Sequence, residues 1–334
     1  MNALASFLDK IRLARSQSHR NMVMFPLLAP ATEDEPEYIT LEEGLNNGAV
    51  AVLEVSEAGS VPDLLLVNAG DKPVLVLDGE ELVGAKQNRV VNTTMLIAAK
   101  SEIIIPVRCV EQGRWRHSSQ EFSAGKRMMY ASLRAVHQDR MHESLSRGEG
   151  HRSEQGMIWS ELGAKAERMS ACSRTSAMSD LFTMNEEPLL TYLKAFRRVD
   201  CQVGGMFAIN GRLVGMDVLG HQCIFSSFFD KVVQSYALDA LDWSADAPEE
   251  ASVRSERAKS LLAQMASASM RVYPGVGLGE SVRFEGRSVF GAALIHAGKV
   301  LHLVAFRHPG LEVANNESRV HLQRASARRR RVVH

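Results

Sequence analysis

The residues with the greatest chemical potential lie together in one stretch, 74–92. A solvated hairpin is usually marked by one or two turn residues of the Asn-Gly type. This stretch instead places many donors and acceptors between β-branched runs, which predicts a polar site built on a sheet. The polar side chains are two adjacent carboxylates, then cationic and amide groups: Glu80, Glu81, Lys86, Gln87, Asn88, Arg89 and Asn92.

The paired carboxylates Glu80 and Glu81 could act as a general base or as metal ligands. On a strand, adjacent side chains point to opposite faces, so we expect one of the two to enter any shared pocket. The alternative is structural: one carboxylate forms a salt bridge to Lys86 or Arg89 and holds the hairpin together. The sequence names no metal.

The cationic and amide side chains that follow suit a phosphate or a ribose. In an extended chain Lys86 and Asn88 share one face, and Gln87 and Arg89 share the other. Lysine and arginine bind anions and amides bind hydroxyls, so Lys86 and Arg89 would hold phosphate while the amides orient the ligand. A satisfied polar network that joins two sheets is the alternative. No glycine-rich phosphate loop occurs, which disfavours a Rossmann site.

A second motif, 105–115, ends in reactive groups. Cys109 and Glu111 would face the same way on a strand, and with Arg114 they could form an activated nucleophile. A buried cysteine is otherwise a small core residue. Trp115 would lie at the rim of the sheet, where its indole could stack on a base or pack against neighbouring helices.

Histidines and cysteines give no metal motif. His-Glu-x-x-His is missing from the sequence, and we predict that His117, His137, His142 and His151 are surface residues. The four cysteines include no Cys-x-x-Cys pair, which favours reduced thiols and a cytoplasmic protein.

Short strands joined by turn signals dominate the sequence outside its middle third. Such spacing predicts antiparallel pairing. Thr40 and Glu43 form a capping-box pattern for a brief helix, and Asn210-Gly211 predicts a hairpin. The fold class is therefore α+β, with a largely antiparallel β-rich core that is sandwich- or barrel-like. We expect an N-terminal helix (1–19), a β-rich part (20–115), a helical insertion (116–200), a second β-rich part with two helices (201–312) and a basic tail (313–334).

The overall charge excludes several classes of partner. Lysine plus arginine number 39 and aspartate plus glutamate 39, so no global field attracts nucleic acid or a membrane surface. No stretch approaches the roughly 20 apolar residues that span a bilayer. The arginine-rich tail is expected to be a solvated, disordered terminus, with nucleic-acid contact as the minor alternative.

Several segments resemble one uncharacterised bacterial family, the ARG and rhodanese-phosphatase-superfamily associated protein domain family. The resemblance covers roughly residues 20–242. It is carried by 78–89 (Asp-Gly-Glu-Glu-Leu-Val-Gly-Ala-Lys-Gln-Asn-Arg) and 105–115 (Ile-Pro-Val-Arg-Cys-Val-Glu-Gln-Gly-Arg-Trp), with support from 38–43, 230–231 and 235–240.

The resemblance implies a metabolic setting and does not imply a particular reaction. The family is named for gene association with ADP-ribosylglycohydrolases and rhodanese or phosphatase relatives, which implies a place in NAD and ADP-ribose metabolism. It also nominates Gln155, Trp159 and Lys231 as supporting members of the site. Our leading hypothesis is a protein that binds or processes a nucleotide-derived ligand. The alternative is a non-enzymatic scaffold that assembles with partner enzymes of ADP-ribose metabolism, and a homo-oligomer is compatible with either.

Overall fold

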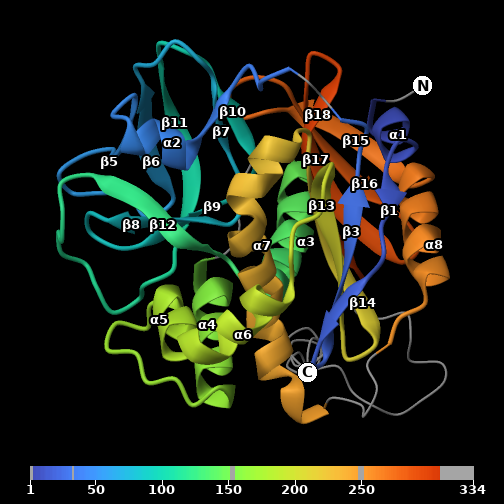
Figure 1. The fold of residues 1–334 in the computed structure, drawn as a ribbon. Coiled ribbons are helices and arrows are strands. Elements are labelled where there is room, and N and C mark those ends of the chain that lie inside the picture. The colour runs from blue at the N-terminus through green and yellow to red at the C-terminus, as the bar shows by residue number, and fades with distance from the viewer. Residues whose placement is uncertain (1–2, 32–33, 151–154, 247–251, 309–334) are drawn as a thin grey trace, which may run out of the picture.

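The computed structural model describes residues 3–31, 34–150, 155–246 and 252–308. Within these ranges the protein is an α+β structure whose sheets are antiparallel except for one parallel pair, β4 with β7. One sheet is large and open, and the strands of the other two curl into a half-barrel beside it (Figure 1). The predicted fold class is confirmed.

The large sheet joins the two ends of the chain. Its order is β1-β3-β13-β14-β18-β17-β16-β15, with β2 added beside β3. Strand β3 pairs with β13, which lies about half the chain away, from Met22↔Ile209 to Leu28↔Gln202. The strands are β1 (Arg12–Leu13), β2 (Gln17–His19), β3 (Met22–Leu28), β13 (Gln202–Ile209), β14 (Arg212–Leu219), β15 (Ser269–Pro274), β16 (Glu280–Glu285), β17 (Val289–His296) and β18 (Lys299–Arg307).

Helices cover both faces of this sheet. Helices α7 (Gln222–Asp242) and α3 (Ala131–Ser146) pack on one face and bury aromatic side chains such as Phe207 and Phe228. Helices α1 (Ala3–Leu8) and α8 (Ser255–Ala266) pack on the other face (Figure 1). The strands between them are therefore buried on both sides, which explains their near-continuous apolar sequence.

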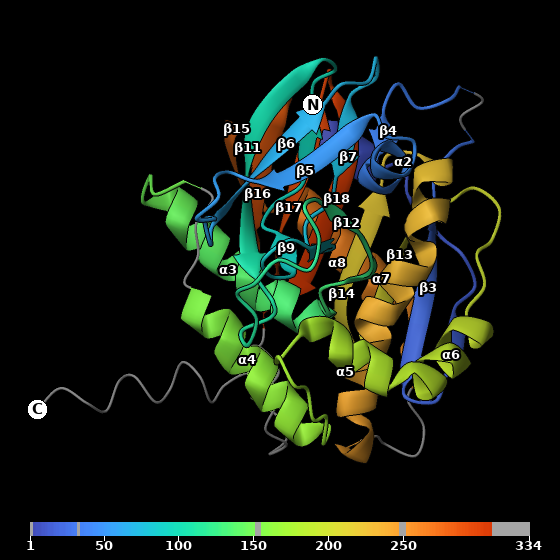
Figure 2. The ribbon, with the colours of Figure 1, turned by 90° about the vertical axis from the view of Figure 1, so that its left-hand side faces the viewer.

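The half-barrel has its own core, in which Val52, Leu66 and Val107 are fully buried. Figure 2 turns its strands toward the viewer. A six-stranded sheet has the order β12-β8-β9-β11-β6-β5, and a three-stranded sheet the order β10-β7-β4. The strands are β4 (Ile39–Thr40), β5 (Val50–Glu54), β6 (Asp63–Asn68), β7 (Val74–Val76), β8 (Glu80–Gly84), β9 (Arg89–Val91), β10 (Met95–Ile97), β11 (Ser101–Cys109) and β12 (Phe122–Met128).

Two local signals in the sequence are confirmed. Thr40 caps helix α2 (Leu41–Asn46), and both bonds of its capping box with Glu43 are formed. Asn210 and Gly211 have positive φ and connect β13 to β14. The remaining helices are α4 (Gln155–Arg168), α5 (Met178–Met184), α6 (Glu186–Ala195) and a 3-10 turn, η1 (Ser244–Asp246).

Other predicted elements need correction. The segment expected to be all helical begins with strand β12 (Phe122–Met128), which pairs with β8 before α3 starts. The N-terminal helix is short, and β1 and β2 follow it. Strand β3 includes Pro26, whose carbonyl accepts a hydrogen bond from Ala14 N at 2.9 Å. The basic tail lies outside the described residues. In the part of the chain that is described, no helix has the length and apolarity to cross a bilayer.

Candidate functional site

The structure divides the predicted site residues between two clusters. Glu80 and Glu81 lie on β8, where helix α7 approaches the half-barrel, and we call them with Lys231 and Arg127 the carboxylate site. Gln87, Asn88, Arg89 and Arg114 gather instead around Glu111, and we call these five residues the polar lock.

Glu80 is held by a main-chain and a side-chain contact. Its Oε2 accepts a hydrogen bond from Leu77 N at 2.7 Å, and its Oε1 lies 3.9 Å from Lys231 Nζ. Lys231 Nζ also donates to Glu42 Oε2 at 2.7 Å, so this lysine joins α7 to α2. Burial raises the pKa of Glu80 to about 7, although Lys231 opposes the shift. The carboxyl is therefore poised between its two protonation states near neutral pH.

Glu81 is the less satisfied of the two carboxyls. Only 2% of its surface is exposed, and its Oε1 has no hydrogen-bond partner among the described residues. Burial raises its pKa to about 8, with Arg127 acting against the shift and Glu111 adding to it. Arg127 lies on β12, next to the bulge between Ala124 and Met128. A buried carboxyl with an unsatisfied oxygen costs free energy unless something else binds it.

The polar lock is centred on Glu111. Its Oε2 accepts from Asn88 N at 3.1 Å and from Arg114 Nε at 2.8 Å, and its main-chain O accepts from Gln87 Nε2 at 3.0 Å. Arg114 also donates to Asn88 Oδ1 at 2.9 Å and to Ala85 O at 2.6 Å. The lock thus ties the β8–β9 connection to the segment after β11. Despite burial, hydrogen bonds from Arg114 hold the pKa of Glu111 below its usual range.

Arg89 extends the lock to the rim of the half-barrel. It is fully buried, donates to Gln87 Oε1 at 2.6 Å and lies 3.8 Å from Glu54. The Trp115 ring lies 5.5 Å from both the Arg89 guanidinium and Lys86 Nζ, in cation–π geometry, and is half exposed. The structural alternative drawn from the sequence paired Glu80 or Glu81 with Lys86 or Arg89. In the structure Glu80 instead faces Lys231, and Arg89 faces Glu54.

The remaining predicted residues lie on or next to β9, β11 and α4. Gln155 bonds to both main-chain groups of Cys109, accepting from its N at 3.0 Å and donating to its O at 2.8 Å. Burial raises the pKa of the Cys109 thiol, which is therefore protonated at neutral pH. Trp159 is half-buried on α4, one turn beyond Gln155. Asn92 is buried after β9, and its main-chain N–H donates to Pro106 O at 3.1 Å.

A third cluster escaped the sequence analysis. Asp78 opens the polar stretch, yet it lies within the protein beside Arg134 of α3, with Arg134 Nε 3.7 Å from Asp78 Oδ2. Arg134 also forms a paired hydrogen bond with Asp217 of β14. His137 is fully buried 3.7 Å from Asp78, which corrects its predicted surface position. His117 is exposed and His142 half-buried, and His151 lies outside the described residues.

The interior cluster, defined by Asp78, Arg134, Asp217, Arg283 and His302, joins the half-barrel to the large sheet. Tyr236 donates to Asp217 at 2.9 Å, and His302 contacts Thr94 at 2.7 Å. Burial alone would raise the pKa of Asp217, but Arg134 and His302 hold it well below its usual range. The members of the interior cluster are scattered over the sequence. Only Asp78 lies in the polar stretch 74–92, so no sequence motif indicated the other members.

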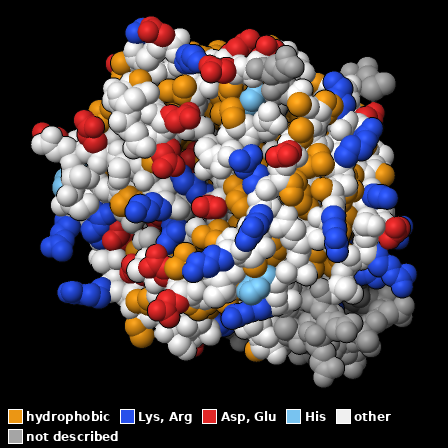
Figure 3. All heavy atoms as spheres, in the orientation of Figure 1, with side chains coloured by type: hydrophobic (Ala, Val, Ile, Leu, Met, Phe, Trp, Pro, Cys, Tyr) orange, Lys and Arg blue, Asp and Glu red, His pale blue; other side chains and the backbone are white. Residues whose placement is uncertain are grey.

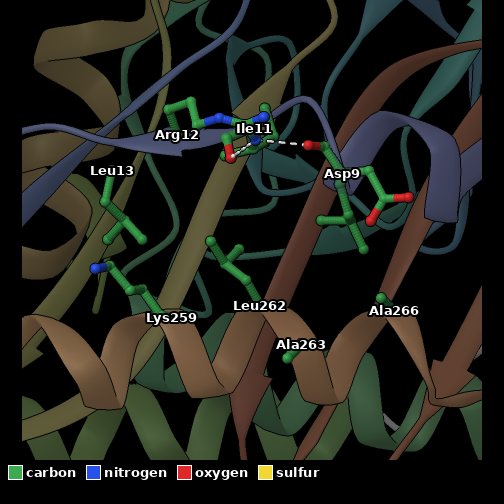
Figure 4. A pocket seen from close by; sticks show the side chains of 9 residues that line it. Asp9, Ile11, Arg12, Leu13, Lys259, Leu262, Ala263 and Ala266 are labelled. Atoms are coloured by element: carbon green, nitrogen blue, oxygen red, sulfur yellow. Dashed lines mark hydrogen bonds between the residues drawn. The ribbon is translucent and has the colours of Figure 1, made fainter.

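The surface adds two observations. On the face in Figure 3 acidic and basic side chains are interspersed, without a single-sign field. A groove of about 280 Å³ lies between the N-terminal segment and α8, lined mainly by apolar side chains such as Leu8, Ile11 and Leu262, with Lys259 at one end (Figure 4). This groove is separate from the three clusters.

Within the described ranges, no three His, Cys, Asp or Glu side chains form a metal-binding group.

These features define a class: an antiparallel α+β protein in which a half-barrel packs on a helix-covered sheet, with buried ionisable groups at the junction. The model of the ARG and Rhodanese-Phosphatase-superfamily-associated Protein domain matches residues 10–306. The chain therefore belongs to this family. Neither the curated proteins nor the solved structures gave a match to the chain.

Proposed function

We propose that the protein binds a nucleotide-derived ligand of the NAD or ADP-ribose kind at the carboxylate site. The observation that carries the proposal is the buried Glu81 carboxyl, whose Oε1 lacks a partner within the described structure beside a strand bulge. Bulges often lie next to active sites, where they re-aim side chains. A ligand hydroxyl would satisfy this oxygen.

Charges around the site suit a ligand that carries both hydroxyls and phosphate. Arg127 is partly exposed and Lys231 is buried, and both would bind phosphate oxygens. The Glu81 carboxyl, with a pKa of about 8, can give or accept a proton near neutral pH and is the proposed acid–base group, while Glu80 contacts Lys231. The family description names association with ARG and rhodanese-phosphatase superfamily proteins, which supports partners of these kinds.

The polar lock favours a second candidate function, an interaction protein without catalytic activity. Its Gln87, Asn88 and Arg114 side chains bond to groups of the protein itself. We assign these three side chains and Arg89 a structural role, which is to stabilise the half-barrel. A ligand site and a docking surface would both depend on that structure. Free thiols at all four cysteines support the cytoplasm as the location.

A thermal-shift screen tests the ligand proposal. The purified protein is heated with NAD, ADP-ribose, nucleoside phosphates or divalent cations. A ligand present at 100 times its dissociation constant adds about 2.7 kcal/mol of stability, which raises Tm measurably. We expect ADP-ribose-like compounds to raise Tm for the wild type and to lose this effect in Lys231→Met.

The matched control is Lys259→Met, which removes an exposed lysine of α8 from the separate groove. It should keep the ligand response. If no compound shifts the wild type, the second candidate function is favoured, and capture of partner enzymes becomes the measurement. An equal shift in wild type and Lys231→Met would place the ligand elsewhere.

A further inference from the structure

A cysteine and a histidine meet at the start of helix α7, outside the three clusters. Cys223 Sγ lies 2.9 Å from His221 Nδ1. The other ring nitrogen, His221 Nε2, lies 2.7 Å from the main-chain O of Asp34. Cys223 is exposed, so its sulfur can be reached from solvent. A nucleophile, a base and a group that orients the base therefore lie next to one another in this order: Cys223 Sγ, the His221 ring and Asp34 O.

The contact to Asp34 fixes the tautomer of His221. A carbonyl oxygen only accepts, so Nε2 must carry the proton that is donated to Asp34 O. In the neutral ring Nδ1 then holds a lone pair, which is shared between the Cys223 thiol and the Cys223 main-chain N–H. The thiol proton is thus placed on a direct path to the imidazole.

His221 also caps α7, which is an uncommon role for histidine. Its Nδ1 accepts from Cys223 N at 3.2 Å, the contact that serine, threonine, asparagine or aspartate usually supplies. Asparagine or aspartate would cap at least as well, so capping alone does not require an imidazole. The positive end of α7, a helix of 21 residues, further stabilises negative charge that develops on Cys223.

We propose that Cys223 is a thiol-exchange site that reacts with small disulfides, with His221 as its base. The thiol proton moves to His221 Nδ1 as Cys223 Sγ attacks one sulfur of the disulfide. The disulfide S–S bond breaks, a new S–S bond forms at Cys223, and the leaving thiolate takes the proton from the imidazolium. One thiol and one mixed disulfide result, so atoms and electrons balance.

The surroundings explain why a base is required. Burial, together with the carboxylates of Glu43 and Glu35, raises the pKa of Cys223. Tyr38 is also close enough to be affected by the Cys223 charge, and its pKa is raised by burial and by that charge. The thiol is therefore protonated in the resting protein, and transfer of its proton to His221 is what releases the nucleophile.

The test compares two exposed cysteines of the intact protein, Cys223 and Cys172, with an aromatic disulfide reagent under native conditions. Rates are measured in Cys172→Ser and Cys223→Ser, which leave one exposed cysteine each. We expect Cys223 to react about tenfold faster than Cys172 at neutral pH, because His221 is an adjacent base for its thiol proton. The decisive variant is His221→Asn in the Cys172→Ser background, because asparagine keeps the helix cap and removes the base.

A fall of about tenfold in the Cys223 rate in His221→Asn, with an unchanged circular dichroism spectrum, supports the proposal. The pH profile of the Cys223 rate gives a second readout, since any part of it that depends on the imidazole base should disappear in His221→Asn. Equal rates at Cys223 and Cys172, or a Cys223 rate that His221→Asn leaves unchanged, would overturn the proposal and leave His221 with its capping role alone.

Discussion

Glu81 combines deep burial, an unsatisfied oxygen and a pKa of about 8, and this combination makes its protonation visible in stability. In the unfolded chain the same carboxyl ionises near 4.5. At a pH between these two pKa values, Glu81 is protonated in the folded state and ionised in the unfolded state. The free energy of unfolding therefore falls as pH rises across this window, by about 1.4 kcal/mol per pH unit for this group.

Glu81→Gln should remove that slope. Glutamine keeps the shape and has no proton to lose, so urea unfolding of the variant between pH 5 and pH 8 should show a flatter stability curve than the wild type. Glu102→Gln, at an exposed position of β11, is the matched control and should follow the wild-type curve. Parallel curves for Glu81→Gln and wild type would mean that Glu81 is ionised throughout.

Arg134 gives a second prediction at the residue scale. It is fully buried and balances Asp217, which it contacts through two nitrogens, and Asp78. Arg134→Met leaves both carboxylates without their cation, and breaking a buried pair in this way costs about 3–5 kcal/mol. Denaturant unfolding measures the loss. Arg140→Met, on the exposed side of the same helix, should change stability by less than about 0.5 kcal/mol.

At the scale of elements, the capping box of α2 is directly testable. Thr40 Oγ1 accepts from Glu43 N at 3.2 Å, and Thr40 N donates to Glu43 Oε2 at 2.7 Å. Thr40→Ala should lower the free energy of unfolding by about 1 kcal/mol, because an N-cap acceptor is lost. Thr40→Ser keeps the oxygen and serves as the control. Equal losses in both variants would assign the effect to the buried methyl group of Thr40 instead of the cap.

Elements with a local cause were predictable. The α2 cap and the Asn210-Gly211 hairpin each follow from neighbouring residues, and the structure has both. Strand β12 was missed because 122–128 reads Phe-Ser-Ala-Gly-Lys-Arg-Met, which contains no β-branched residue. Its strand state comes from pairing with β8, a tertiary contact that overrides weak local propensity.

At the scale of the molecule, the sequence predicted where polar groups concentrate but not how they divide. Neighbouring side chains of 78–89 reach the interior cluster, the carboxylate site and the polar lock in turn, because the chain turns at Gly79 and again after β8. Asp217 and His302 of the interior cluster come from strands that begin more than 120 residues after this stretch. Only the pairing of β14 with β18 and the packing of α3 bring them together, and no local pattern encodes that approach.

The ligand proposal also has a consequence for the whole molecule. Lys231 joins α7 to α2 and faces β8, so a phosphate bound there would tie the helix layer to the half-barrel. The complex should therefore protect the amides of α2 and β8 from hydrogen exchange more than those of α8, which lies on the opposite face of the sheet. Uniform protection, or protection of α8 alone, would contradict a site at this junction.

Calorimetric titration of ADP-ribose into the wild type, Lys231→Met and Lys259→Met tests the central claim most directly. Near-ultraviolet circular dichroism first establishes that each variant is folded. We predict saturable binding by the wild type and Lys259→Met, and affinity at least about tenfold weaker in Lys231→Met, because a charge-assisted bond contributes about 1.5–3 kcal/mol. Absence of binding by the wild type, or equal affinity in all three proteins, would contradict the carboxylate site as the place where this ligand binds.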